Sequence, residues 1–279
     1  MHLNSVNPRL SIGVVLYQNS RKQLQQLLCS VELNRAAPGC PPFELNFIDN
    51  SPDASLEALV RELAPQAGYQ HARRNLGFGA GHNVLMDRAF QDADVGYYLC
   101  VNPDSILHPD CLAELVSEVN RQRKPGLVEA LQFPDEHPKV YDRQTHHTPW
   151  CSGCVLLITR ALHLVVGGFD ENFFMYCEDV DLSWRARAHQ FNISIAPKAL
   201  AHHYVGNRPD SPNGRLMLLK SGTYLAHKYG NGKMHRAWLN EYLNSGGEPF
   251  MTPTTPAPSA EMLKVADFAH LFHMSEVRW

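Results

Sequence analysis

The chain has 279 residues, of which 44% are apolar and 19% are charged, so it can form one sizeable core with a small appendage. A formal net charge of −3 and the lack of long Lys/Arg runs exclude the basic surface typical of nucleic-acid binding, and we expect no nucleic-acid partner. No apolar stretch reaches the roughly 18 residues of a membrane span, and the N-terminus does not have the pattern of a secretion signal, so we expect a cytoplasmic protein.

The first half of the chain alternates between predicted strands and predicted helices. Residues 9–20 form a β-rich apolar run that ends at Gln-Asn-Ser, and leucines at helical spacing follow at 21–34. Residues 43–53 repeat the strand pattern, end at Asp-Asn-Ser-Pro-Asp, and precede a helical segment at 54–64. This order predicts an α/β fold with a mostly parallel central sheet flanked by helices.

The predicted strands of this half end in Asn or Asp. After a glycine cluster and another helical segment, the strand at 95–101 runs directly into Asn102-Pro103-Asp104. In open α/β sheets, ligands collect at the carboxyl ends of strands, where loops leave the sheet. We therefore expect Asp49 and Asp104 to lie at a ligand-binding edge, although a turn without function would favour the same residue types.

The second half contains a second segment whose residues could carry out catalysis. A helix is predicted at 111–123, the Pro- and His-rich stretch 124–149 predicts a connecting loop over the site, and a strand follows at 151–158. Residues 178–181, Glu-Asp-Val-Asp, have the composition of a helix N-terminus. Three carboxylates in four positions repel one another, and this repulsion together with burial would raise a pKa and produce a base.

The C-terminal part is predicted to be helical. Helices are expected at 212–243, four prolines at 249–260 are typical of an extended linker, and a final helix at 261–277 would carry an apolar face. That face needs a covering surface. We expect it to be the protein's own domain, with a second copy in a homodimer or the inner face of the cytoplasmic membrane as the alternatives.

Seven scattered cysteines, an odd number, do not predict a disulfide framework. The spacing Cys151-Ser-Gly-Cys154, with His146 and His147 upstream, would suit a zinc site or a redox pair. Such zinc sites normally have a second ligand pair on a separate turn, whereas the residues after Cys154 continue as a strand. We therefore favour a packing role for these cysteines.

Seven short segments between residues 9 and 207 carry a further signal through their order and spacing. They are IGVVLYQN, FIDNSPD, RNLGFGAGHN, VNPDS, WCSGCVLLI, VGGFDENFFMYCEDVDLSWR and the pair His202-His203. The ordered set resembles the bacterial family 2 glycosyltransferases, and within them the rhamnosyltransferase-like branch. The longest segment is the most specific of the seven.

The resemblance implies a GT-A fold at 1–207, with a nucleotide-sugar donor half at about 1–110 and an acceptor half at about 111–207. A helical extension at 208–248, the proline-rich linker and a C-terminal helix at 261–279 would follow. It also implies an inverting glycosyltransferase. The donor would be dTDP-rhamnose, or a UDP-sugar, and the acceptor a glycan or lipid-linked precursor of surface polysaccharide or lipopolysaccharide, reached from the cytoplasm or peripherally at the inner face of the membrane.

The resemblance further assigns the residues that would carry the chemistry. Asp179 matches the catalytic base, with Glu178 beside it to contact the acceptor or tune the base. Asp104 matches the last position of a DxD-type motif for Mg²⁺ or Mn²⁺, and Asn102 stands at its first position. His203 is implied near the metal or the diphosphate, with the neighbouring His202 as the alternative.

The implied donor-binding positions are spread over several segments. Asp49 matches the residue that reads the nucleotide base, and a loop near the ribose and diphosphate follows it along the chain. Two more positions lie beneath the donor sugar. The full implied set is Tyr17, Asp49, Asn75, Gly77, Asn83, Asn102, Asp104, Trp150 and Gly153.

Two other functions deserve comparison with this one. The glycines at 77, 79 and 81 indicate a dinucleotide site, but the fingerprint of an NAD-dependent oxidoreductase is G-x-G-x-x-G after the first strand, not G-x-G-x-G after the second. A non-catalytic module that binds sugar nucleotides or a partner is the other alternative. Its only support is Asn102 in place of a carboxylate.

Overall fold

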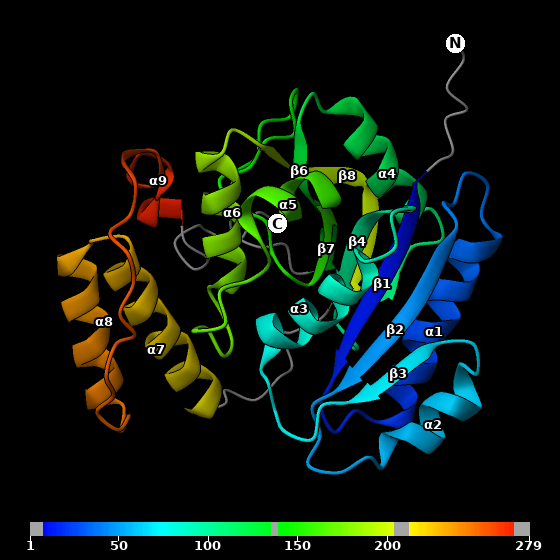
Figure 1. The fold of residues 1–279 in the computed structure, drawn as a ribbon, viewed down its shortest axis with the longest axis horizontal. Coiled ribbons are helices and arrows are strands. Elements are labelled where there is room, and N and C mark those ends of the chain that lie inside the picture. The colour runs from blue at the N-terminus through cyan, green and yellow to red at the C-terminus, as the bar shows by residue number, and fades with distance from the viewer. Residues whose placement is uncertain (1–7, 135–138, 204–211, 271–279) are drawn as a thin grey trace.

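The structure, a computed structural model, describes residues 8–134, 139–203 and 212–270, and one eight-stranded sheet forms its centre (Figure 1). The strands are β1 (Arg9–Leu16), β2 (Phe43–Asp49), β3 (Gly68–His71), β4 (Val95–Val101), β5 (Ile106–Leu107), β6 (Pro125–Pro134), β7 (Val155–Thr159) and β8 (Asn192–His203). Their order across the sheet is β3-β2-β1-β4-β7-β6-β8-β5.

The sheet is mixed but mostly parallel. Strands β3, β2, β1 and β4 pair in parallel, and so do β6 and β8. Strand β7 is antiparallel to both β4 and β6, and β5 is antiparallel to β8. The carboxyl ends of β1, β2, β4, β6 and β8 therefore lie at one edge. Because β7 runs the opposite way, the residues that precede it arrive at that same edge.

Helices cover both faces of the sheet, which confirms the predicted α/β fold (Figure 1). One face packs against α1 (Arg21–Ala36), α2 (Leu56–Leu63) and α4 (Cys111–Arg121). The other packs against α3 (Phe78–Ala89), α5 (Arg160–Val166) and α6 (Glu178–Ala188). Alternate strand residues serve the two faces: in β7, Leu157 joins the first core and Leu156 the second, as the two-residue period of a strand requires.

Strand β6 occupies residues 125–134 of the stretch 124–149, which its composition predicts to be a connecting loop, whereas the described residues 139–149 belong to no helix or named strand. Its apolar residues Leu127, Val128 and Ala130 are fully buried between β7 and β8. The strand also buries two polar residues, Glu129 and Gln132, which interrupt the apolar run. With both faces covered, neither the alternation of a half-exposed strand nor a continuous apolar run is left in the sequence.

The C-terminal helices pack on the α/β core. They are α7 (Pro212–Lys228), α8 (Gly232–Asn244), α9 (Ala260–Val265) and the short 3₁₀ helix η1 (Phe268–His270). Met262, Val265 and Phe268 pack against an aromatic cluster that includes Trp184 of α6 and Trp238 of α8. The final helix thus contacts its own chain as expected. It ends earlier than predicted, and the part of that prediction at 271–279 lies outside the described residues.

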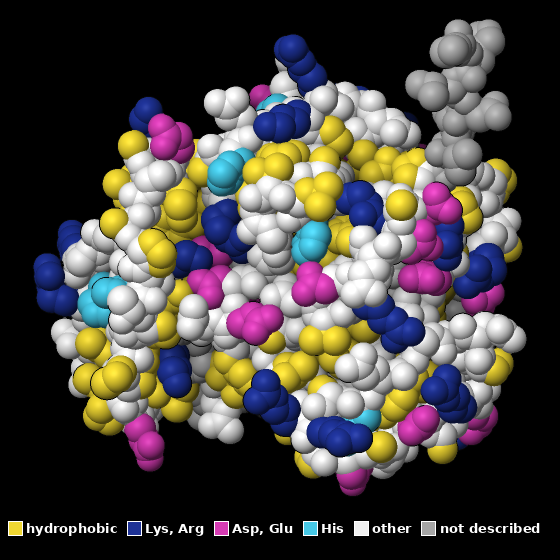
Figure 2. Space-filling model, in the orientation of Figure 1, with side chains coloured by type: hydrophobic (Ala, Val, Ile, Leu, Met, Phe, Trp, Pro, Cys, Tyr) yellow, Lys and Arg dark blue, Asp and Glu magenta, His cyan; other side chains and the backbone are white. Residues whose placement is uncertain are grey.

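The surface charge and the helix composition bear on what the chain can bind. Lys and Arg side chains are spread among acidic ones on the face in Figure 2, without one large basic patch. Among the residues that the structure describes, no helix has the length and apolar composition needed to cross a membrane.

A buried ionic network fastens α7 to α6. The Lys228 ammonium lies 2.6 Å from both Asp170 Oδ2 and Asp181 Oδ1. Arg185 also binds Asp181, with its Nε 2.8 Å from Oδ2, and the Asp181 side chain is fully buried. Burial alone would raise the pKa of Asp170, but the hydrogen bond and charge of Lys228 outweigh burial and hold that pKa below its ordinary value.

We expect Lys228→Met to lower the free energy of unfolding by about 3 kcal/mol, because it leaves buried carboxylates with too little positive charge. Urea unfolding followed by circular dichroism measures this change. The exposed Lys233 offers a matched control: Lys233→Met should stay within about 0.5 kcal/mol of wild type. Equal stability of the two variants would contradict the role given to the network.

Candidate active site

Asp104 and His203 meet at the carboxyl edge of the sheet. Asp104 lies in the turn after β4, where the Ser105 N–H donates to the Asn102 carbonyl at 3.0 Å, and His203 is the last residue of β8. The distance from His203 Nε2 to Asp104 Oδ1 is 3.5 Å. On its other side, His203 Nδ1 lies 3.1 Å from Gln132 Oε1. The structure thus joins two residues that are about a hundred positions apart in the chain.

The chemistry of this pair suits a hard divalent cation. A carboxylate oxygen and an imidazole nitrogen that bind the same ion, each at about 2.1 Å, lie roughly 3 Å apart, close to the spacing observed here. Asp104 and His203 are therefore candidate metal ligands. The ring of His202 lies elsewhere, with its centre 5.3 Å from that of the Phe133 ring. Among the described residues, no group of three His, Cys, Asp or Glu side chains could hold a metal, so the remaining ligands would come from substrate and water.

Asp179 lies at the start of α6, on the other side of this edge. Its Oδ2 accepts the Gly153 N–H at 2.9 Å, and its Oδ1 accepts the Val180 N–H at 2.8 Å. The neighbouring Glu178 is 4% exposed, and its Oε2 has no hydrogen-bond partner among the described residues. The two carboxyl groups are therefore held differently: both oxygens of Asp179 accept backbone N–H groups, whereas Glu178 Oε2 is buried without a hydrogen-bond partner.

The environment raises the pKa of both carboxyls. Burial is the main cause for Glu178, whose pKa lies well above its ordinary value, and the negative charge of Asp179 adds to the shift. Burial also raises the pKa of Asp179, against the opposing effects of the Gly153 N–H and the Lys139 charge. We expect Glu178 to keep its proton to higher pH than Asp179 does. That division leaves Asp179 as the carboxylate able to accept a proton.

One short segment, Ser152–Cys154, links the two sides of the site. Cys154 Sγ lies 3.2 Å from Ser105 Oγ, next to Asp104 in the chain, and Gly153 binds Asp179. A side chain at Gly153 would bring a Cβ within 2.9 Å of the Phe78 ring. This glycine is therefore required for close packing, and the segment that it occupies contacts both Asp179 and Ser105, the residue after Asp104.

A strained backbone leads into α6. Tyr176 and Cys177 have φ angles of 70° and 67°, in the left-handed region that residues with side chains rarely adopt. The preceding Phe174 carbonyl accepts the Phe78 N–H at 3.0 Å, and a Cβ on Gly77, whose φ is +81°, would lie 2.1 Å from that oxygen. The glycine loop is thus in direct contact with the loop that leads into the acidic segment of α6.

The predicted donor-binding residues vary in their availability. Asp49 is fully buried, and its carboxylate accepts the Tyr69 hydroxyl at 2.8 Å and the Ser51 N–H at 2.9 Å. Asn75 accepts the Gly77 N–H at 2.9 Å, which fixes the glycine loop. Tyr17, directly after β1, is 48% exposed.

Asn83, by contrast, supports the loop before α6. Its Nδ2 donates to the Phe169 carbonyl at 2.9 Å and to Glu171 at 3.1 Å, and its Oδ1 accepts the Phe169 N–H at 2.8 Å. Both ends of the amide are thus engaged within the protein. The contact between Asn83 and the donor stays a prediction, because the structure uses both ends of this amide for hydrogen bonds within the protein.

Three residues in the site's surroundings were not predicted. Glu129 and Gln132 of β6 are buried, and Lys139 is 2% exposed and forms an ion pair with Glu129. All three fall in the stretch predicted as a loop, where a charged residue looks like a surface residue. Only the structure shows that they are internal, with the charges of Lys139 and Glu129 paired and Gln132 bound to Glu129.

The two cysteines that could indicate zinc or redox chemistry face different neighbours. Cys151 Sγ donates to the Ser194 carbonyl at 3.6 Å, whereas Cys154 Sγ contacts Ser105 Oγ. Burial strongly raises the pKa of the Cys151 thiol, which disfavours the thiolate needed for either chemistry. These contacts support the packing role.

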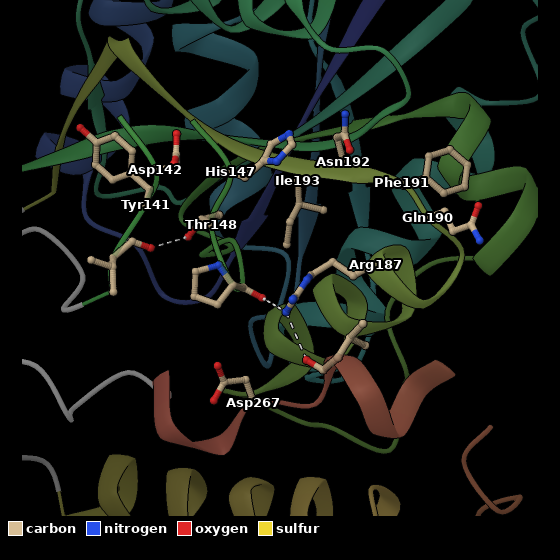
Figure 3. A pocket seen from close by; sticks show the side chains of 13 residues that line it. Tyr141, Asp142, His147, Thr148, Arg187, Gln190, Phe191, Asn192, Ile193 and Asp267 are labelled. Atoms are coloured by element: carbon tan, nitrogen blue, oxygen red, sulfur yellow. Dashed lines mark hydrogen bonds between the residues drawn. The ribbon is translucent and has the colours of Figure 1, made fainter. Parts of the chain in front are cut away.

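A cavity of about 780 Å³ lies near the C-terminal end of α6, whose Arg187 is part of its lining (Figure 3). Val140, Pro149 and Arg187 are part of its lining, and the Arg187 guanidinium donates to the Pro149 carbonyl at 3.1 Å. Arg187 is eight residues after Asp179 in α6, or about 12 Å along the helix axis. Lys139 and Trp150, the chain neighbours of Val140 and Pro149, are buried.

Comparisons with known proteins identify relatives of the chain. The family model described as Glycosyl transferase family 2 matches residues 11–182. The N-acetylglucosaminyl-diphospho-decaprenol L-rhamnosyltransferase of Mycobacterium tuberculosis is 36% identical over 247 residues, covering 72% of this chain and 78% of that protein. Rhamnosyltransferase WbbL of Escherichia coli K12 is 27% identical over 162 residues, which cover 46% of this chain and 61% of that protein's length.

Solved structures show the same GT-A fold. A mannosyltransferase of Pyrobaculum calidifontis, in complex with GDP-Man and Mn²⁺, has a TM-score of 0.59 at 16% identity, covering 86% of this chain and 69% of that one. TarS of S. aureus has a TM-score of 0.54 at 19% identity, covering 85% of this chain and 43% of that one. At these identities the likeness concerns the fold alone.

We expect Glu178→Gln to stabilise the protein increasingly as pH rises. Because the folded-state pKa of Glu178 is raised above its ordinary 4.5, wild type loses stability as pH rises from there toward the folded pKa. The variant avoids this loss, so its advantage grows by up to about 1.4 kcal/mol per pH unit in that range. Urea unfolding at pH 4, 6 and 8 measures it, with the exposed Glu248→Gln as control. A pH-independent difference would contradict burial of an unpaired carboxyl.

Proposed function

The chain belongs to glycosyl transferase family 2, and from this premise we propose that it transfers L-rhamnose from dTDP-rhamnose to an acceptor hydroxyl, with inversion at the sugar's anomeric carbon. One observation carries the proposal: the segment Ser152–Cys154 binds Asp179 through the Gly153 N–H and, through Cys154, contacts Ser105 in the turn that holds Asp104 beside His203. A single displacement needs a base on one face of the sugar and charge neutralisation at the leaving group on the other face. Asp179 would supply the base, and the Asp104–His203 pair would hold the cation that neutralises the charge.

The donor would bind along the carboxyl edge of the sheet. Asp104 and His203 would hold Mg²⁺ or Mn²⁺, which when bound neutralises charge on the leaving diphosphate. Asn102, at the first position of the motif, would contribute through its neutral amide. Asp49 would contact the nucleotide base of the donor, as its place at the end of β2 allows. The glycine loop from Asn75 would line the ribose and diphosphate.

Asp179 would act as the general base. Its carboxylate takes the proton of the acceptor hydroxyl as that oxygen forms a bond to the anomeric carbon, while the bond from this carbon to the diphosphate oxygen breaks. The amide of Gly153 aims the carboxylate, and the raised pKa makes it a stronger base than an ordinary aspartate. Glu178, with its proton retained, would donate a hydrogen bond to substrate rather than compete for the proton.

The names of the relatives support the choice of sugar and acceptor. Both are rhamnosyltransferases, and the mycobacterial protein's name gives a lipid-linked diphosphosugar. We infer a lipid-linked glycan precursor as acceptor here, which would bring the chain to the inner membrane surface peripherally. A UDP-sugar donor is the alternative, and Mn²⁺ in the mannosyltransferase complex supports a divalent cation without choosing between Mg²⁺ and Mn²⁺.

The test combines a donor panel with two site variants. Nucleotide release is measured with dTDP-rhamnose, UDP-sugars and GDP-mannose, in Mg²⁺, Mn²⁺ and EDTA, with a polyprenyl-diphosphate-linked N-acetylglucosamine acceptor. We expect turnover with dTDP-rhamnose that requires the cation. Turnover only with another donor would move the proposal to that sugar, and turnover unaffected by EDTA would remove the metal from it.

In this assay Asp179→Asn should lower kcat by about 10³-fold while donor affinity, measured by calorimetry, stays within about twofold. Asp104→Ala should instead weaken cation-dependent donor binding. Asp94→Asn, at an exposed position, is the matched control and should behave like wild type. An active Asp179→Asn variant would exclude this residue as the base.

A further inference from the structure

A buried ion pair lies beneath the segment that links the two sides of the site. Lys139 and Glu129 are 2% and 3% exposed and bind each other. The Lys139 ammonium also lies 4.0 Å from the centre of the Trp150 ring, so protein groups surround the charge. Two opposite charges this deep are costly to bury, and a buried pair is weak support for stability in itself. Its contacts therefore matter more than its presence.

Glu129 connects this pair to both sides of the site. Its Oε2 accepts the Ser152 N–H at 2.7 Å, and the next amide, Gly153 N–H, donates to Asp179 at 2.9 Å. Two consecutive backbone amides therefore bind two carboxylates from different elements. Toward the other side, Gln132 donates to Glu129 Oε1 at 3.3 Å. The same Gln132 side chain contacts His203.

Charge is unevenly distributed around Asp179. The titratable groups that influence it are Glu178 on its own helix, Glu129 of β6, Lys139, and the thiols of Cys100, Cys151 and Cys177. All but Lys139 are neutral or negative. The Lys139 charge lowers the pKa of Asp179, and the charge of Asp179 in turn raises the pKa of Glu129.

We propose that Lys139 and Glu129 are positioning residues for the transfer reaction. The pair fixes Ser152–Cys154 between the base and the metal-site histidine, and Lys139 supplies the positive charge that lets Asp179 work as a carboxylate beside two other acids. This inference rests on the proposed role of Asp179 as base. It gives the ion pair a function that a purely structural pair would not have.

A titration of Asp179 tests the charge effect without any turnover. Protein labelled with ¹³C at the aspartate carboxyls is titrated by NMR, and the Asp179 signal is the one missing from Asp179→Asn. In Lys139→Met, a substitution of similar length, we expect the Asp179 midpoint to move to higher pH, by about tenfold in proton affinity. In Glu129→Gln it should move to lower pH. An unmoved midpoint in both variants would overturn the charge effect.

Kinetics then test the positioning effect. The acid limb of kcat/KM should move with the NMR midpoint in each single variant, which a structural pair would not cause. Lys139→Met/Glu129→Gln leaves no unpaired buried charge, so it should fold even where a single variant does not. We expect its kcat to fall about tenfold at optimal pH with donor affinity unchanged. A folded double variant with wild-type kcat would overturn the positioning role.

These readouts separate the two ideas. If Lys139→Met moves the Asp179 midpoint but Asp179→Asn retains activity, the pair sets the charge of Asp179 and the proposed base is wrong. If the midpoint is fixed while Asp179→Asn is inactive, the base stands and the inference about Lys139 fails. Lys139→Arg keeps the charge and should leave the midpoint within about twofold of wild type.

Discussion

Two neighbouring amides determine the geometry of this site. The N–H groups of Ser152 and Gly153 donate to Glu129 and Asp179, carboxylates that come from a buried strand and from the first turn of α6. Neither carboxylate could be placed there without compensation, because buried negative charges repel each other and lose their hydration. The amides, together with Lys139, provide that compensation and thereby fix Asp179 relative to the sheet.

The direction of β7 places these amides where the chemistry requires them. In a fully parallel sheet the residues before β7 would start at the opposite edge, away from the turn after β4. Because β7 is antiparallel to β4 and β6, the segment before it lies at the same edge as the turn after β4, and there it contacts Ser105 and Asp179. The antiparallel strand is thus the part of the fold on which the proposed site depends.

The parallel half of the fold and the acidic residues at strand ends could be predicted from sequence, because strand and helix periods alternate clearly up to residue 101. Strand β6 could not, since Glu129 and Gln132 interrupt its apolar run. The contact between Asp104 and His203 follows only from long-range pairing of strands. The engagement of Asn83 with Phe169 likewise depends on a loop whose left-handed residues, Tyr176 and Cys177, carry no glycine signal.

The most direct measurement is a crystal structure with Mn²⁺ and dTDP, in which anomalous scattering locates the ion. We expect a peak about 2.0 to 2.3 Å from Asp104 and His203, with the diphosphate completing the ligands of the ion and Asp179 facing the position of the missing sugar. A metal held by Glu178 and Asp179 instead, or a nucleotide bound away from the carboxyl edge of the sheet, would contradict it.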